Sequence, residues 1–253
     1  MGINPSVSDD ATGNSDQSSS QLIDFDEALQ VLKDGDIELI ARMPYSSNAT
    51  FLVRADAKEK SVKGIYKPVE GERPLWDFPP GLYKREIAAY ELSQQLGWNV
   101  VPPTVERVRP HGIRSVQLFN DADFEQHHFT LVKDPRNHLS LQKLCVLDLL
   151  ANNTDRKAGH CLLSRSGLIF GIDHGLCFSS EYKLRTVIWD FANQPINEAL
   201  MHGVGQVCEG SVNRVMDWLE EPEIEALISR SQWVREHPFF PEDDGYRWPW
   251  PLI

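Results

Sequence analysis

The apolar segment Leu139–Ala151 runs directly into a polar stretch that reads N-N-T-D-R-K-A-G-H. The apolar run is too continuous for the one-sided pattern of a surface helix, so we expect a central helix that is buried on all sides. Asp155 and His160 lie in the polar stretch, and Asp173 comes after a hairpin predicted around Ser164–Gly167. The rest of the chain must therefore surround this helix and leave the acidic loop at its end accessible.

The residues before this helix have the pattern of a small antiparallel sheet. Asp24 is expected to cap a first helix that stops at Gly35. Three β-rich stretches, a second helix and a hairpin follow, which we place at Ile37–Met43, Thr50–Ala55, Val62–Lys67, Tyr83–Leu96, Thr104–Arg109 and Ile113–Phe119. The last third of the chain is predicted to be mainly helical, with its clearest pieces at Val212–Leu219 and Glu223–Ser229.

Charge and apolar content exclude several classes of protein. The 253 residues carry a net charge of -12, which disfavours nucleic acid and anionic membranes as partners, because both require clustered Lys and Arg. No apolar run reaches the length of a membrane span, and the N-terminus does not have the pattern of a secretion signal. Cys145, Cys161, Cys177 and Cys208 are too far apart for a zinc ribbon, so we expect reduced, mostly buried thiols. A cytoplasmic protein without stable membrane association is the expectation.

The acidic residues fit the chemistry of phosphoryl transfer. That reaction requires one carboxylate to orient or deprotonate the acceptor and oxygen ligands for the cations on the phosphates. Asp155 and Asp173 suit these roles, although Asp residues also cap turns with no further function. Lys67 at the end of a strand and Glu86 on the next helix supply an ion pair of the kind that contacts nucleotide phosphates.

Several motifs together resemble the phosphatidylinositol 3- and 4-kinase-related superfamily. They read G-I-Y-K-P, R-E-I-A-A-Y-E-L, V-P-P-T, S-V-Q-L-F, N-T-D-R and I-D-H-G-L-C-F, and they cover roughly Leu39–Trp189. The chain is particularly similar to type II phosphatidylinositol 4-kinases and to small actinobacterial proteins of this superfamily. The resemblance implies an α+β, two-lobed protein-kinase-like fold, with an N-lobe over 21–119 and a mainly helical C-lobe over 120–253. Residues 1–20 are mostly Ser, Asp, Asn and Gly, a composition that predicts a disordered acidic tail.

The resemblance also implies a role for each site residue. Lys67 would contact the α- and β-phosphates of ATP with Glu86 as its partner, and Asp155 would be the catalytic carboxylate. Asp173 would be the principal ligand of Mg²⁺ or Mn²⁺, and His160 stands where a second metal ligand is expected. The remaining nucleotide-binding residues are those of the phosphate loop and of the hinge that receives adenine: Ser46, Ser47, Asn48, Thr50, Val116, Gln117, Leu118 and Phe119.

The chain departs from the family pattern at His174, which follows Asp173 where Asn or Phe would be commoner. Two further departures bear directly on activity. The phosphate loop contains no glycine, and His160 replaces the usual asparagine. Imidazole is a poorer ligand for magnesium than oxygen is, so activity is expected to favour manganese and to fall as the pH drops through about 6.5.

Three functions are therefore compared. The first is an ATP-dependent kinase that acts on a protein or a small hydroxylated acceptor; a lipid acceptor is disfavoured by the acidic charge and the absence of a polybasic patch. The second is a nucleotide-binding pseudokinase, which the two departures favour. The third is a metal-dependent hydrolase that would use Asp155, His160, Asp173 and His174. It leaves Lys67 and Glu86 unexplained and ranks last.

Overall fold

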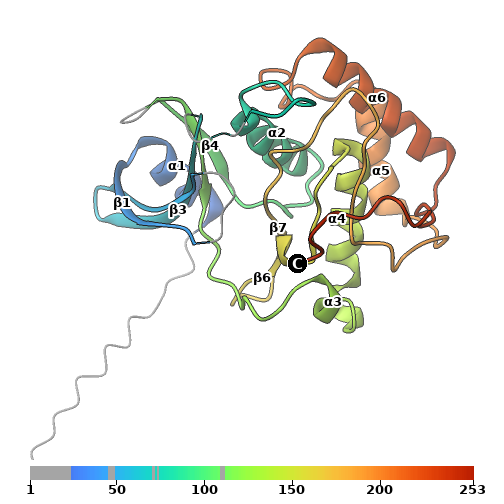
Figure 1. Ribbon diagram of the computed structural model, residues 1–253, viewed down its shortest axis with the longest axis horizontal. Helices are drawn as coiled ribbons and strands as arrows, with labels where there is room; N and C mark the ends of the chain where they lie inside the picture. The colour runs from blue at the N-terminus through green and yellow to red at the C-terminus, as the bar shows by residue number, and fades with distance from the viewer. Residues whose placement is uncertain (1–23, 45–48, 70–71, 73, 109–111) are drawn as a thin grey trace, which may run out of the picture.

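The computed structural model describes residues 24–44, 49–69, 72, 74–108 and 112–253 (Figure 1). The predicted tail over 1–20 and the loop residues Ser46, Ser47 and Asn48 lie outside these ranges. The fold is α+β, with an antiparallel sheet in the N-terminal part and helices in the C-terminal part. No helix in the described ranges has the length and apolar character that crossing a membrane requires.

A five-stranded antiparallel sheet forms the N-terminal part, in the order β1-β2-β3-β5-β4. Its strands are β1 (Asp36–Arg42), β2 (Phe51–Ala57), β3 (Lys60–Pro68), β4 (Thr104–Arg107) and β5 (Arg114–Leu118). Helix α1 (Phe25–Asp34) packs on the sheet through Ala28, Val31 and Leu32 and ends at Gly35, as predicted. Asp24 precedes the helix, but its side chain makes no capping hydrogen bond.

Helix α2 (Leu82–Gln95) joins the sheet to the helical part. Its side chains are buried along most of its length, and Ala88, Ala89 and Leu92 belong to the large core rather than to the small core of the sheet. The helix ends before Gly97, whose φ of +66° is a left-handed conformation that favours glycine. Helix α2 also contacts β4 and β5, so Glu86 is held between the sheet and the helical part.

The C-terminal part is built around α4 (His138–Ala151), which is buried as the apolar segment predicted. Short helix α3 (His128–Leu131) precedes it, and the hairpin of β6 (Cys161–Leu163) and β7 (Ile169–Gly171) follows. Helices α5 (Glu198–Cys208) and α6 (Glu221–Glu236) complete the core. All four cysteines are free thiols, and three of them are buried.

The predicted helix over Val212–Leu219 is wrong. This segment forms consecutive turns, in which the N–H of Val215 donates to the carbonyl of Val212 and that of Trp218 donates to that of Val215. Val212, Val215 and Leu219 are still buried, so the turns reproduce the apolar spacing that suggested a helix. The segment is confined between Gly210, which has a φ of +83°, and Glu220, which caps α6.

The last residues return to the loop that follows α4. The N–H of Ala158 donates to the carbonyl of Leu252 at 2.7 Å, and Trp248 packs against the large core. Trp250 is 86% exposed. The Trp-Pro segment, residues 248–251, is therefore a packed tail with one indole left open to solvent.

Candidate active site

A cavity of about 730 Å³ lies between the sheet and the helical part. It brings together segments that are far apart in the sequence, from β3 and α2 to the loops after α4 and β7. Apart from Val116, every described residue of the predicted site lines it: Thr50, Lys67, Glu86, Gln117, Leu118, Phe119, Asp155, His160 and Asp173.

Lys67 is held between two carboxylates at the centre of the cavity. Its Nζ pairs with Glu86 of α2 and lies 2.8 Å from Oδ1 of Asp173. Burial alone would lower the pKa of Lys67, but the attraction of Asp173 and Glu86 together raises it, so the ammonium stays charged. The charge of Lys67 in turn holds the pKa of Asp173 well below its usual range. The three groups therefore form an ionised triad.

Glu86 is held in place from two further directions. Its Oε2 accepts the backbone N–H of His174 at 3.1 Å, which connects α2 to the Asp173 loop. The preceding residue, Arg85, forms a buried ion pair with Glu223 of α6. These contacts position the Glu86 carboxylate without any contribution from a nucleotide.

Asp155 lies on the loop after α4 and faces the same cavity. Partial burial raises the pKa of its carboxyl, while the ammonium of Lys157, 2.9 Å away, opposes that shift. The backbone N–H of Asp155 donates to Asn153, which fixes the loop directly before the carboxylate. A carboxylate with a raised pKa is a better proton acceptor than an exposed one.

His160 lies beside Asp173 in the cavity. Its Nδ1 is 2.9 Å from the carbonyl of Asp155 and 3.4 Å from the backbone N of Lys157. The shorter contact is to a carbonyl, which only accepts, and it assigns the proton to Nδ1. Nε2 then carries a lone pair and lies 3.4 Å from Oδ2 of Asp173. Burial lowers the pKa of His160 to about 4, so the ring is neutral. A neutral imidazole beside a carboxylate is a donor pair that fits a divalent cation also bound to phosphate oxygens.

The low pKa of His160 corrects the expected pH dependence. The ring does not take up a proton near pH 6.5, because burial outweighs the attraction of Asp173. Any acid limb that comes from His160 is therefore expected near pH 4.

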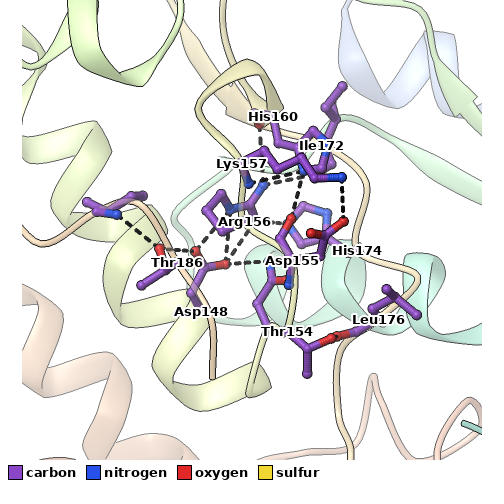
Figure 2. Close-up of polar contacts among 12 residues, drawn as sticks. Asp148, Thr154, Asp155, Arg156, Lys157, His160, Ile172, His174, Leu176 and Thr186 are labelled. Atoms are coloured by element: carbon purple, nitrogen blue, oxygen red, sulfur yellow. Dashed lines mark hydrogen bonds and ion pairs between the residues drawn. The ribbon is translucent and has the colours of Figure 1, made fainter. Parts of the chain in front are cut away.

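Arg156 is the centre of a buried network that the sequence analysis missed (Figure 2). Its Nε donates to Oδ2 of Asp148 in α4 at 2.9 Å, and its Nη2 donates to Oδ1 at 2.9 Å. Nη1 donates to the carbonyl of Ile172, directly before Asp173, and Nη2 lies 2.6 Å from Nε2 of His174. One guanidinium thus connects α4, the Asp155 loop and the Asp173 loop.

His174 takes part in this network and not in a metal site. The ring is buried, and burial lowers its pKa well below the usual range, so the neutral Nε2 accepts from Arg156. In the described part of the chain, no group of three or more His, Cys, Asp and Glu side chains is arranged to hold a metal ion. The hypothesis of a metal-dependent hydrolase required a set of metal ligands that includes His174.

Three of the four predicted hinge residues, Gln117, Leu118 and Phe119, line the cavity, whereas Val116 does not. Val116 is fully buried in the small core, where it packs over Gly64. Glycine at position 64 leaves room for it, since a Cβ there would lie 2.8 Å from Val116. The N–H groups of Leu118 and Phe119 donate to Pro103 and Lys63, so they are engaged within the protein.

Two solved structures share this fold, and one of them is a kinase. The chain matches the Golgi casein kinase with Mn and ADP bound at a TM-score of 0.54 and 13% identity, over 90% of this chain and 80% of that one. It matches hydra Fam20 with sugar at a TM-score of 0.52 and 13% identity, over 84% and 87% of the two chains. At 13% sequence identity, the likeness establishes the fold alone. That fold is the two-lobed, protein-kinase-like class.

Sequence relatives identify the family within this class. A model of phosphatidylinositol 3- and 4-kinases matches residues 105–202. Mycobacterium tuberculosis protein Rv2133c is 36% identical over 271 residues, which cover 90% of this chain and 96% of that protein. The chain belongs to the family of this mycobacterial protein, within the phosphatidylinositol 3- and 4-kinase-related superfamily. Arabidopsis thaliana phosphatidylinositol 4-kinase gamma 4 is 26% identical over 50% of this chain, and the match spans 30% of the plant protein.

Proposed function

We propose that this protein is an ATP-dependent phosphotransferase that acts on a protein or a small hydroxylated acceptor. The observation that carries the proposal is the ionised triad of Lys67, Glu86 and Asp173, which faces Asp155 across one cavity. A structural ion pair would not require a second carboxylate with a raised pKa beside it. Phosphoryl transfer uses each of these groups.

Each residue has a role in the proposed reaction. Lys67, oriented by Glu86, binds phosphate oxygens of ATP, and Gln117, Leu118 and Phe119 line the adenine end of the cavity. Asp155 accepts the proton of the acceptor hydroxyl as its oxygen attacks the γ-phosphorus, and the bond to ADP breaks. Asp173 and His160 would hold a divalent cation, which supplies charge neutralisation on the phosphates. The ammonium of Lys157 is placed to orient the Asp155 carboxylate.

A double-mutant cycle on Lys67 and Glu86 tests this proposal. Lys67→Ala and Glu86→Ala are each expected to weaken ATP binding by about tenfold or more, because charge-assisted contacts to phosphate are strong. The double variant should lose no more than the worse single variant, because Glu86 acts through Lys67. Isothermal titration with ATP and Mn²⁺ measures the binding, and thermal melting verifies that each variant is folded. Additive losses, or no loss in Lys67→Ala, contradict the proposal.

A nucleotide-binding protein without transfer activity is the second candidate. It is favoured by the phosphate loop without glycine and by His160 in place of the usual asparagine. The two candidates differ in one measurement, which is the conversion of ATP to ADP under conditions where ATP binding is saturated. Binding without conversion, over a panel of hydroxylated acceptors, supports the second candidate.

Substitution of His160 tests its assignment as a metal ligand. His160→Asn is expected to shift the preference from Mn²⁺ toward Mg²⁺, because an amide oxygen replaces an imidazole nitrogen. Between about pH 5 and 8 the pH profiles of the two proteins should coincide, since His160 is already neutral in that range. ATP affinity measured with each metal provides the readout. A histidine that only supports the loop through Asp155 predicts an unchanged metal preference and a modest loss of stability.

A further inference from the structure

The last residues of the chain reach the candidate active site. The end of the chain lies beside the hairpin of β6 and β7, next to the loop that carries Asp155 (Figure 1). Pro251 lines the same cavity as Asp155. None of the residues assigned to the proposed reaction comes from residues 247–252, which are called here the C-terminal strap.

One end of the strap is joined to η3 (Ala158–His160), a short 3₁₀ helix in the Asp155 loop. Ala158 is the first residue of this helix, so its N–H has no partner within the helix. The carbonyl of Leu252 accepts this N–H at 2.7 Å. Ala158 is fully buried, and a buried N–H without a partner costs free energy. The strap therefore supplies the acceptor that the start of η3 requires.

Apolar packing fixes this end of the strap on the body of the protein. Trp248 and Leu252 pack against the large core, and Pro249 is buried between them in the sequence. Pro249 and Pro251 each fix their own backbone φ, which restricts the conformations open to the strap. The carbonyl of Leu252 is therefore held in place opposite Ala158.

Arg247 anchors the other end of the strap on the segment that follows Asp173. Its guanidinium lies 5.1 Å from the ring centroid of Trp189, and its Nη1 donates to the hydroxyl of Tyr182 at 2.8 Å. The backbone carbonyl of Arg247 accepts the N–H of Thr186 at 3.1 Å. The strap thus contacts both of the loops that contribute carboxylates to the cleft.

The Asp155 loop is fixed at two points, and the strap provides the second of them. At the first point, the N–H and the carbonyl of Arg156 each make a backbone hydrogen bond of 3.1 Å to residues 185–187. At the second point, the strap holds Ala158. Lys157 lies between the two, and its ammonium is 2.9 Å from the Asp155 carboxylate. The geometry of this ion pair therefore depends on both points.

We propose that the C-terminal strap positions the Asp155 loop for phosphoryl transfer, with Leu252 as its principal anchor. This inference rests on the proposed function, because its consequence is a rate of transfer. Lys157 directly precedes η3 and His160 ends it, so release of the strap displaces both side chains. Lys67 and Glu86 are carried by β3 and α2 instead, so nucleotide binding should depend little on the strap.

Hydrogen exchange in the full chain tests the strap independently of activity. Leu252→Ser removes the apolar anchor, and the amide of Ala158 should then exchange about tenfold faster, because its acceptor is no longer held. Amides of the N-terminal sheet should keep their native rates. Leu252→Met keeps the apolar volume and should restore nearly native exchange at Ala158. An unchanged rate at Ala158 in Leu252→Ser overturns the proposal.

Turnover at saturating ATP and Mn²⁺ measures the consequence for transfer. Leu252→Ser and Arg247→Ala are each expected to lower it by about tenfold, because small displacements of catalytic groups are costly, while ATP affinity stays within about twofold. Tyr246→Ala removes a side chain that is 88% exposed directly before the strap, and this control should change neither quantity.

The outcomes separate the strap from the proposed function. Native turnover in Leu252→Ser despite faster exchange, or equal losses of turnover and ATP affinity, overturns the positioning role. If the native protein binds ATP without converting it, the proposed function fails instead, and the exchange rate at Ala158 alone then decides whether the strap holds the loop.

Discussion

Replacing Asp155 with asparagine is expected to reduce ATP turnover by about 10²–10⁴-fold, the range attributed to a positioned general base. The amide keeps the shape of the carboxylate but cannot accept the proton of the acceptor hydroxyl. Burial raises the pKa of Asp155, so its charged form is disfavoured by its surroundings. A neutral asparagine should therefore leave the melting temperature unchanged or slightly raise it. Steady-state conversion of ATP to ADP, with titration calorimetry on the same preparations, measures both parts of the prediction.

The contrast with Asp173 makes this prediction specific. Asp173→Asn should lose the dependence of ATP binding on Mg²⁺ or Mn²⁺, whereas Asp155→Asn should keep it. Asp217→Asn, at an exposed position away from the cleft, serves as the control and should leave both turnover and binding unchanged. An equal loss of metal-dependent binding in Asp155→Asn and Asp173→Asn would show that the two carboxylates do not have separate roles.

Arg156→Met is expected to lower the free energy of unfolding by about 3–5 kcal/mol, because it leaves the buried carboxylate of Asp148 without its partner. For a chain of this size, such a loss corresponds to a fall in melting temperature of about 6–20 °C. Turnover should fall as well, because Arg156 also holds the carbonyl of Ile172, next to Asp173. Thermal melting monitored by circular dichroism measures the stability.

Two further variants distinguish the loss of the buried ion pair between Asp148 and Arg156 from the loss of a charge elsewhere on the protein. Arg54→Met removes an exposed cation that pairs with Glu38 on the sheet, and it should leave the melting temperature unchanged within error. The double variant Asp148→Leu and Arg156→Met removes both buried charges and should recover part of the lost stability, but not the turnover. If Arg156→Met melts at the same temperature as the native protein, the network is not what holds the two loops together.

Much of the architecture could be predicted because hydrophobic periodicity and local turn signals dominate it. The β-rich stretches, α2 and the continuous apolar run of α4 each correspond to an observed element. Lys67, Glu86, Asp155 and Asp173 line one cleft, as expected from their order along strand, helix and loops. Their catalytic roles stay predictions, because a cleft position alone does not establish a reaction.

The sequence contains one signal from which the buried network around Arg156 could have been predicted in part. Asp148 is a charged residue inside the apolar run of α4, and a fully buried carboxylate needs a cationic or hydrogen-bonding partner. The sequence does not identify that partner, because the chain reverses at Asn152, which adopts a φ of +50°, before it reaches Arg156. The side chains of β5 that reach the cavity could not be predicted either, because the first four residues of this strand are all buried and show no alternation.

The position of Lys67 between Glu86 and Asp173 has a thermodynamic consequence. Two carboxylates share one ammonium, so the triad carries a net negative charge, and the phosphates of ATP without a metal are repelled by it. A divalent cation would in turn have to compete with Lys67 for Asp173, whereas phosphates that engage Lys67 would free that carboxylate. Under the proposed function, each ligand would therefore raise the affinity of the other by the same factor. Heterotropic cooperativity between nucleotide and metal would then originate in a contact between three side chains.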